Sequence, residues 1–366
     1  MFLYNYLKME NVILTRTKKR DKGKRNINYL SLNHNNCIKN ISFKFVFSIF
    51  ICLIIFIIWK LISKKNNVLI NTLNNSPNST NQGQKIPFDK NFDYRNYQRE
   101  VITDELKQKA GWILSPNDVY FLNGLIRKHR PVNILEIGSA YGGSANLILN
   151  AIKDIPDSKL ISMDLYESFN NKKIGYLVKE RFPELMNKWQ LFAGDMPYKA
   201  LIKLNMKFDF FYLDSAHIRP GELFNIIEAL PFLNENAIVV LHDTHWHLDH
   251  VLHTEYTLKE ATIMPTQIYL LSALVGEKIV LYDEKNNLFN IGAICLESNQ
   301  NKHLVNYFLL LNTLWQYMPT DDQLNGFREF IDKYYEEKLL LKIYDDSVEY
   351  NKIYFQNIKE NKYRKG

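Results

Sequence analysis

The stretch V-N-I-L-E-I-G-S-A-Y-G-G-S, residues 132–144, decides the fold class. Its first half is a mostly apolar run, as expected of a central parallel strand that is covered on both faces. Gly138 and Gly142 then let the backbone turn tightly and approach a ligand closely. Ser144 is placed to cap the helix that begins after the turn. A strand, a glycine-rich turn and a helix N-terminus in this order predict a nucleotide-binding site.

Further strand-like runs alternate with helical stretches downstream of this turn. The runs K-L-I-S-M-D, W-Q-L-F-A-G-D, F-D-F-F-Y-L-D and A-I-V-V-L-H-D end at Asp164, Asp195, Asp214 and Asp243. This alternation predicts a doubly wound α/β sheet, with the four acids at the edge where the carboxyl ends of parallel strands meet. A single acid at such a place often caps the next helix, but four in succession favour a ligand site.

Two further segments frame this alternation. Upstream, Ser115-Pro116 followed by Asp118 predicts a helix start, and that helix should end before Pro131. Downstream, the runs K-I-V-L-Y and I-G-A-I-C-L are separated only by D-E-K-N-N-L-F-N. This spacing is too short for a helical crossover, so the last two strands should form an antiparallel hairpin.

The composition is that of a folded chain with one main domain and appendages, since 46% of the 366 residues are hydrophobic and 23% are charged. Ten of the first 44 residues are Lys or Arg, so much of the net charge of +7 lies in that tail. We therefore expect no nucleic-acid partner. Of the three cysteines only Cys295 lies in the folded region, which excludes a disulfide framework and a cysteine-based zinc site there.

The N-terminal part of the chain predicts a membrane anchor. Residues 1–44 form a basic flexible tail, and residues 45–62 are apolar and long enough for a single transmembrane helix. Lys64 and Lys65 follow this run, where a signal peptide would carry a small-residue cleavage site. The basic residues close to the run nearly balance, and only a more distant cluster favours a cytoplasmic N-terminus. The chain is thus expected to be a single-pass membrane protein, with the side of its folded domain left open.

The remaining chain divides into three predicted parts. Residues 63–100 are rich in Asn, Ser and Pro and form a linker, in which Asn78-Ser79-Thr80 is a glycosylation acceptor if this side is lumenal. Residues 101–300 form the α/β domain. Residues 301–366 form a helical extension without a catalytic motif. A lid, a packing appendage and a surface for a homo-oligomer are equally open roles for this extension.

The glycine-rich turn alone leaves two nucleotides open. G-S-A-Y-G-G also matches G-x-A-x-x-G, a variant of the dinucleotide fingerprint, with Asp164 at about the distance of a ribose-binding acid. An NAD(P)-dependent oxidoreductase is therefore an alternative. The final hairpin, Glu136 within the strand and the acid pair Asp214 and Asp243 all favour a different nucleotide.

Taken together, the motifs resemble those of class I S-adenosylmethionine-dependent methyltransferases over roughly residues 105–297. The resemblance rests on E-x-G-x-x-x-G, the strand-end acid after it, G-D after the third strand, D-S-A-H after the fourth and L-H-D after the fifth. The nearest branch is the small-molecule O-methyltransferases, including macrocin-type sugar O-methyltransferases. This resemblance implies a Rossmann-like sheet of seven strands in which the last strand is antiparallel.

The same resemblance implies a site for the donor, S-adenosylmethionine. The residues that would line its methionine and ribose part are Glu136, Gly138, Ser139 and Gly142. Asp164 would bind the ribose hydroxyls, for which a carboxylate is a suitable double acceptor, and Asp195 would lie near the adenine.

The acceptor side is expected across the same sheet edge. Asp214 and Asp243 lie on neighbouring predicted strands, so both carboxylates are placed to hold one Mg²⁺, which would lower the pKa of a bound hydroxyl. His217, three residues after Asp214, is the expected general base, and His217 and Asp214 form the expected catalytic pair. His242 precedes the last acid, where resembling metal-dependent enzymes carry an acid pair or Asp-Asn, and this departure leaves the metal open.

Residues 242–253 carry five of the nine histidines in the chain. Helical spacing within this stretch would also suit zinc or a transition metal. A polar loop in which only His242 or His245 approaches the substrate is the favoured interpretation.

The sequence thus predicts a membrane-anchored O-methyltransferase that uses S-adenosylmethionine on a small hydroxylated acceptor, such as a sugar or glycan. Two alternatives remain open. One is the NAD(P)-dependent oxidoreductase, and the other is a catalytically inactive, membrane-anchored binding protein that retains the sheet without the donor site.

Overall fold

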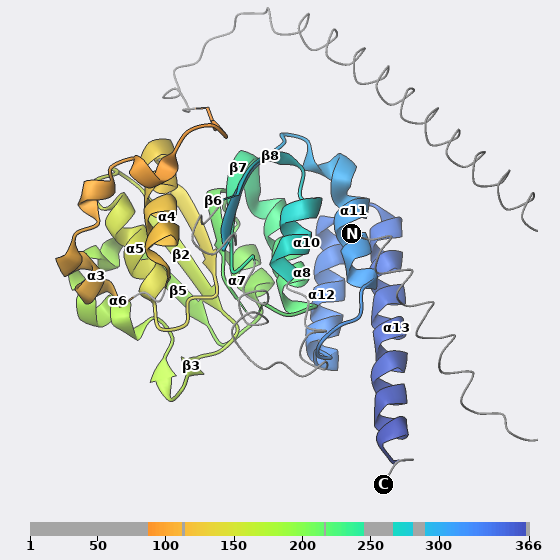
Figure 1. Cartoon of the computed structure of the whole chain (residues 1–366). Helices are drawn as coiled ribbons and strands as arrows, with labels where there is room; N and C mark the ends of the chain where they lie inside the picture. Colours follow the sequence, from red (N-terminus) through yellow and green to blue (C-terminus); the bar gives the residue numbers. More distant parts are fainter. Residues whose placement is uncertain (1–86, 112–113, 216, 245–265, 281–289, 364–366) are drawn as a thin grey trace, which may run out of the picture. The chain divides into compact units, whose positions relative to one another are not determined.

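The computed structural model describes residues 87–111, 114–215, 217–244, 266–280 and 290–363 (Figure 1). In these residues seven strands form one sheet in the order β5-β2-β1-β6-β7-β9-β8. The strands are β1 (Asn133–Ile137), β2 (Lys159–Asp164), β5 (Trp189–Ala193), β6 (Phe208–Leu213), β7 (Leu233–His242), β8 (Gly276–Val280) and β9 (Ile291–Leu296). A separate two-stranded hairpin, β3 (Ser168–Phe169) and β4 (Lys172–Lys173), follows β2 and has no counterpart among the predicted elements.

Strand pairing confirms the predicted doubly wound α/β sheet. β1 is central and pairs in parallel with β2 and β6, and β5 and β7 extend the parallel part on either side. β9 runs antiparallel to both β7 and β8, between which it lies. The last strand of the sheet in the sequence is therefore the antiparallel one, as predicted, and it forms a hairpin with β8.

Helices cover both faces of the sheet (Figure 1). The helices are α3 (Asp104–Ala110), α4 (Pro116–His129), α5 (Gly143–Ile152), α6 (Tyr176–Arg181), α7 (Pro197–Leu204), α8 (Gly221–Ala229), α10 (Thr266–Ala273), α11 (Leu304–Leu309), α12 (Asp321–Tyr334) and α13 (Lys338–Tyr363). Short 3-10 helices are η1 (Tyr94–Asn96), η2 (Arg99–Val101), η3 (Pro183–Lys188), η4 (Leu230–Phe232), η5 (Gln300–His303) and η6 (Leu310–Asn312). Alternate residues of β1 divide between two cores, because Ile134 packs with α3 to α6 and Leu135 packs with α7, α8 and α10 to α13.

The helix that precedes β1 begins and ends where the sequence predicts. Ser115 caps α4, since its side chain accepts a hydrogen bond from Asp118 N, and Pro116 occupies the first helical position. The predicted cap of α5 is wrong. That helix has Gly142 at its N-cap position without a side-chain bond, and the Ser144 hydroxyl instead donates to Glu136 Oε1 at 2.7 Å.

The C-terminal extension packs into the same core as the sheet. The ring of Phe327 in α12 stacks on Phe224 in α8 with centroids 4.1 Å apart. The Tyr335 hydroxyl donates to the carbonyl oxygen of Ile227 at 2.6 Å. Of the roles left open by the sequence, packing against α8 is therefore one that the extension fulfils.

The predicted tail (residues 1–44), the predicted transmembrane helix (residues 45–62) and most of the predicted linker lie outside the described residues. Within the residues that are described, no helix is both long and apolar enough to cross a membrane.

Candidate active site

The glycine-rich turn joins β1 to α5. Gly138 and Gly142 have φ angles of 93° and 96°, a backbone conformation that L side chains rarely adopt. A Cβ atom on Gly138 would overlap the carbonyl oxygen of Asp214, and one on Gly142 would lie 2.9 Å from Cγ2 of Val178. The predicted tight turn is confirmed, and contacts within the protein already require both glycines.

Asp164, the predicted ribose-binding acid, ends β2 beside this turn. Its Oδ2 atom accepts hydrogen bonds from the backbone N–H groups of Ser139 and Ala140 at 3.1 and 3.0 Å, and its Oδ1 atom accepts one from Tyr166 N at 3.0 Å. A carboxylate has about four acceptor sites, and these bonds take two on Oδ2 and one on Oδ1, so Oδ1 keeps capacity for one further donor. The carbonyl oxygen of Asp164 also accepts from Gly194 N at 3.0 Å, which holds the end of β5 next to this acid.

Glu136 lies inside β1 and has no exposed surface. Its carboxylate accepts hydrogen bonds from Ser144 Oγ at 2.7 Å and Ser162 Oγ at 2.5 Å. Burial raises the pKa of Glu136 to about 7, and these hydroxyl donors oppose the shift only in part. Nearby, Ser139 Oγ is buried and makes no hydrogen bond of good geometry among the described residues, although it lies close enough to Glu136 to lower the pKa of that acid. That orphaned hydroxyl fits the binding of a polar ligand at the turn.

The buried Glu136 carboxyl makes the stability of the ligand-free protein depend on pH. Its pKa rises from 4.5 in the unfolded chain to about 7 in the folded one, so the native state holds the proton more tightly and stability falls as pH rises between these values. Glu136→Gln, which cannot ionise, should therefore raise the free energy of unfolding at pH 8 by about 3 kcal/mol. Urea unfolding at pH 5 and pH 8 measures this, with exposed Glu235→Gln as the control. An equal loss of stability with pH in wild type and Glu136→Gln would contradict the expectation.

Asp195, predicted to lie near the adenine, follows β5 and is exposed. Its two carboxylate oxygens lie 2.7 and 2.9 Å from Lys199 Nζ, and one accepts from Met196 N at 2.8 Å. β2 and β5 pair in parallel with Asp164 opposite Ala193. Asp164 and Asp195 therefore lie at the same edge of the sheet, as the sequence predicts.

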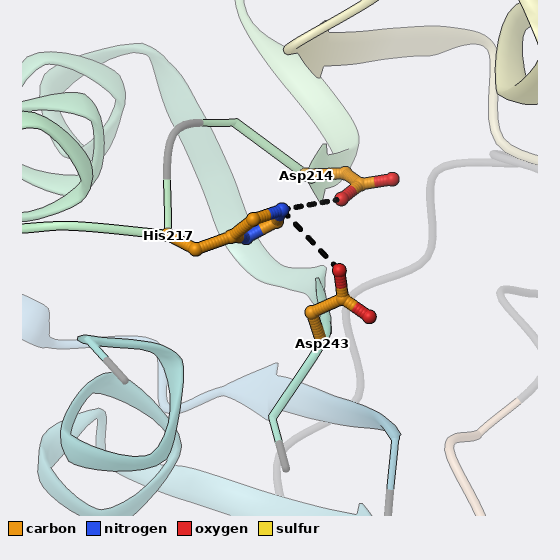
Figure 2. A group of neighbouring side chains, drawn as sticks. All are labelled: Asp214, His217 and Asp243. Atoms are coloured by element: carbon orange, nitrogen blue, oxygen red, sulfur yellow. Dashed lines mark ion pairs between the residues drawn. The ribbon is translucent and has the colours of Figure 1, made fainter. Parts of the chain in front are cut away.

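The predicted acceptor residues come together where β6 and β7 end (Figure 2). His217 Nε2 lies 3.7 Å from Asp214 Oδ1 and 3.2 Å from Asp243 Oδ2. The backbones of His217 and Asp243 have φ angles of 57° and 54°, an uncommon conformation outside glycine that persists only where neighbours hold it. The two strand-end acids and the histidine named from the sequence thus form one cluster.

The other ring nitrogen of His217 faces a second, fully buried acid. His217 Nδ1 lies 3.4 Å from Glu222 Oε1, and the side-chain amide of Gln267 contacts both groups. Burial lowers the pKa of His217, but the hydrogen bond and charge of Glu222, with the charges of Asp214 and Asp243, raise it above its ordinary value. The cluster therefore favours the protonated imidazole, and His217 must pass on this proton before it can accept another.

A second histidine lies behind these three residues, and the sequence did not predict its partners. His242 is buried, with Nδ1 3.3 Å from Asp214 Oδ1 and Nε2 3.5 Å from Asp118 Oδ2. Asn290 Nδ2 donates to Asp118 Oδ2 at 3.4 Å and to Asp243 Oδ1 at 3.1 Å. Burial lowers the pKa of His242, but Asp214, Asp118 and Asp243 raise it well above its ordinary range. The resulting imidazolium helps to keep Asp214 ionised. Burial raises the pKa of Asp214, but the two histidines lower it by more, so that it lies below its ordinary value.

The cluster also fits a divalent cation. Asp214, His217 and Asp243 each offer one ligand atom, and these atoms lie within 4.8 Å of one another. Carboxylate oxygens suit Mg²⁺ or Mn²⁺, and an imidazole suits transition metals better than Mg²⁺. The residues present therefore fit three protein ligands, where the sequence analysis predicted two acids and a separate base.

Of the histidine-rich stretch, only the residues up to Thr244 are described. His242 approaches the site through Asp214, as set out above. His245 and the three histidines after it lie outside the described residues, so their predicted place in a polar loop stays a prediction.

Comparison with known proteins places a family match over this site. Residues 135–244 match the family model Methyltransf_24, described as a methyltransferase domain. The matched span begins within β1 and ends two residues after β7, and it includes the predicted donor residues and the cluster of Asp214, His217 and Asp243. No curated protein matches the chain in sequence.

Among the solved structures that the chain matches are two O-methyltransferases and one methyltransferase. The O-methyltransferase TomG from Streptomyces achromogenes, in complex with SAM, shares 18% identity at a TM-score of 0.40, over 53% of this chain and 90% of that one. An O-methyltransferase from Bacillus cereus with SAH shares 17% identity at a TM-score of 0.39, over 57% and 92%. The SAH-bound methyltransferase PaMTH1 from Podospora anserina shares 16% identity at a TM-score of 0.39, over 54% and 89%.

Proposed function

We propose, from the premise that residues 135–244 form a methyltransferase domain, that this chain transfers a methyl group from S-adenosylmethionine to a hydroxyl group of a small acceptor. A sugar or glycan is the acceptor class that we favour. The observation that carries the proposal is the cluster of Asp214, His217 and Asp243 beside the glycine-rich turn. This cluster provides what an O-methyl transfer needs besides the donor, which is a place to hold a hydroxyl and a route for its proton.

The donor side of the proposed site is the turn after β1 with the ends of β2 and β5. Asp164 binds a ribose hydroxyl at Oδ1 through its remaining acceptor capacity, and the bonds that it accepts from Ser139 N and Ala140 N keep the turn in place. The orphaned hydroxyl of Ser139 binds a polar group of the methionine part. Glu136 stabilises the first turn of α5, because its carboxylate accepts a hydrogen bond from the Ser144 hydroxyl.

The acceptor side of the proposed site is the cluster across the sheet edge. His217 accepts the proton of the acceptor hydroxyl at Nε2, while Glu222 orients the ring from Nδ1. Glu222 is fully buried and burial raises its pKa, so it is also placed to take the proton that His217 holds in the resting cluster. Asp214 and Asp243 stabilise the imidazolium that forms when His217 takes this proton, since their carboxylate oxygens lie 3.7 and 3.2 Å from Nε2.

Asp214, Asp243 and His217 are the residues that would hold a divalent cation here, Mg²⁺ or Mn²⁺. When bound, such a cation supplies a lowered pKa for a coordinated hydroxyl. Under this arrangement His217 is a ligand, and the base is a different group. The two roles of His217 exclude each other, and they predict opposite results for Mn²⁺ binding by the variant His217→Ala.

We also propose that residues 45–62 anchor the protein in a membrane as a single pass, which the apolar character of that run supports. The full chain should therefore sediment with membranes.

Donor binding is tested with the same full chain after detergent extraction. It should bind S-adenosylhomocysteine with a Kd in the micromolar range or below, measured by isothermal titration calorimetry. NAD and NADP should bind at least 100-fold more weakly. A chain that prefers NAD or NADP is an oxidoreductase candidate, and one that binds no nucleotide supports the inactive binding protein.

A further inference from the structure

A pocket of about 510 Å³ opens at the carboxyl ends of β2 and β5. One side is formed by residues that follow these strands, among them Tyr166, Asp195 and Met196. The other side is formed by the C-terminal extension, through Tyr317, Met318 and the first turn of α12. Its volume is within the range of about 300–1,000 Å³ that is usual for small-molecule sites.

Hydrogen bonds order the extension on both sides of Tyr317 and Met318. On one side, Gln316 N donates to the carbonyl oxygen of Arg219 at 2.9 Å, and Arg219 N donates to Gln316 Oε1 at 2.8 Å. On the other, Thr320 and Gln323 form a capping box, in which each side chain accepts from the other residue's backbone N–H. Tyr317 and Met318 are therefore held in place between two pairs of hydrogen bonds.

The pocket lies where the donor would continue beyond its ribose. Asp164 at the end of β2 is the proposed ribose acid, and Gly194 at the end of β5 donates to its carbonyl oxygen. A base attached to that ribose therefore extends over the end of β5, where Asp195 and Met196 line the pocket. A purine is flat and aromatic, and it packs well between a thioether and aromatic rings such as those of Tyr166 and Tyr317.

We infer that the C-terminal extension supplies the outer wall of the adenine pocket, with Tyr317 and Met318 against the purine. This inference rests on the proposed function and deepens it. Residues 317–318 lie outside the span matched by the methyltransferase domain, which ends at residue 244. Donor binding in this chain thus depends on a segment that the domain itself does not contain.

The test measures the affinity of the full chain for two adenosine compounds, S-adenosylhomocysteine and 5′-deoxy-5′-methylthioadenosine, by calorimetry. Tyr317→Ala should weaken both about tenfold or more, since the loss of one aromatic partner of a base has an effect of this size. The ratio between the two affinities should stay unchanged, because the amino-acid part of the donor is remote from Tyr317. Tyr317→Phe, which keeps the ring, should bind both compounds nearly as wild type does. Tyr350→Ala is the matched control, since Tyr350 is an exposed tyrosine of the same extension.

Met318→Ala is the second variant, and it decides the question if Tyr317→Ala fails to fold. The inference is overturned if both folded variants bind the two compounds within twofold of wild type. It is also overturned if only S-adenosylhomocysteine is weakened, because the affected contact would then lie at the amino-acid end. A wild-type chain that binds neither compound contradicts the proposed function first, and the inference with it.

Discussion

His217→Ala is expected to lower the turnover number of methyl transfer at least 100-fold while the affinity for S-adenosylhomocysteine stays within about twofold of wild type. A positioned general acid or base typically contributes 10²- to 10⁴-fold, and the loss of a metal ligand has a similar or larger effect. His217 faces Asp214 and Asp243 on the acceptor side, whereas the proposed donor contacts come from the turn after β1. The measurement is transfer of a labelled methyl group to whichever member of a panel of sugars and catechols the wild type methylates.

The same variant separates the two roles of His217. If the imidazole is the base, Mn²⁺ binding, measured by calorimetry, should be kept in His217→Ala and lost in Asp214→Asn. If the imidazole is a ligand, both variants should lose Mn²⁺. The control is His303→Ala, which removes a histidine that pairs with Glu297 outside the site and should leave turnover unchanged. Normal turnover in His217→Ala would show that this residue has a structural role only.

Asp164→Ala is expected to weaken S-adenosylhomocysteine binding about 100-fold. One hydrogen bond from a ribose hydroxyl to a charged acceptor contributes up to about 3 kcal/mol, which corresponds to roughly this factor. The variant also removes the bonds that Asp164 accepts from Ser139 N and Ala140 N, so the loss of the turn adds to the effect. Asp164→Asn keeps the shape of the side chain without its charge, so it should bind S-adenosylhomocysteine more weakly than wild type and more tightly than Asp164→Ala.

A matched control separates the ribose contact from this support of the backbone. Asp209 at the start of β6 also accepts hydrogen bonds from two consecutive backbone N–H groups, those of Val132 and Asn133, at 3.3 and 3.2 Å. Asp209→Ala should lower the melting temperature without weakening donor binding, because this acid lies at the amino ends of the strands. If Asp164→Ala binds S-adenosylhomocysteine as wild type does, the assigned ribose contact is wrong.

Signals that depend on neighbouring residues predicted the sheet correctly. The apolar runs that end in acids became β2, β6 and β7, and the short spacing before I-G-A-I-C-L became the antiparallel pair of β8 and β9. Ser115 and Pro116 start α4 because capping and a fixed proline φ act within one turn of chain. The strand-end acids also met at one edge, because parallel pairing alone brings them there.

Contacts between distant residues were beyond the reach of such signals. Asp118 was predicted only as part of a helix start, yet its carboxylate meets Asn290, which lies 172 residues further along the chain. Glu222 and Gln267 reach His217 from α8 and α10 because the fold places those helices side by side. Ser144 was assigned to a cap, whereas the buried carboxylate of Glu136 competes for its hydroxyl and wins, since an unpaired buried acid would be more costly than an uncapped helix.

The close approach of Gly138 to Asp214 determines how the two halves of the site are aligned. Asp214 N donates to the carbonyl oxygen of Ile137 at 3.0 Å, and the missing side chain of Gly138 lets the carbonyl of Asp214 lie directly against the turn. An in-line displacement tolerates little error in the separation of its nucleophile and its leaving group. In the proposed site, this main-chain contact would fix the distance between donor and acceptor, so the side chains that contact the acceptor could change without altering that distance.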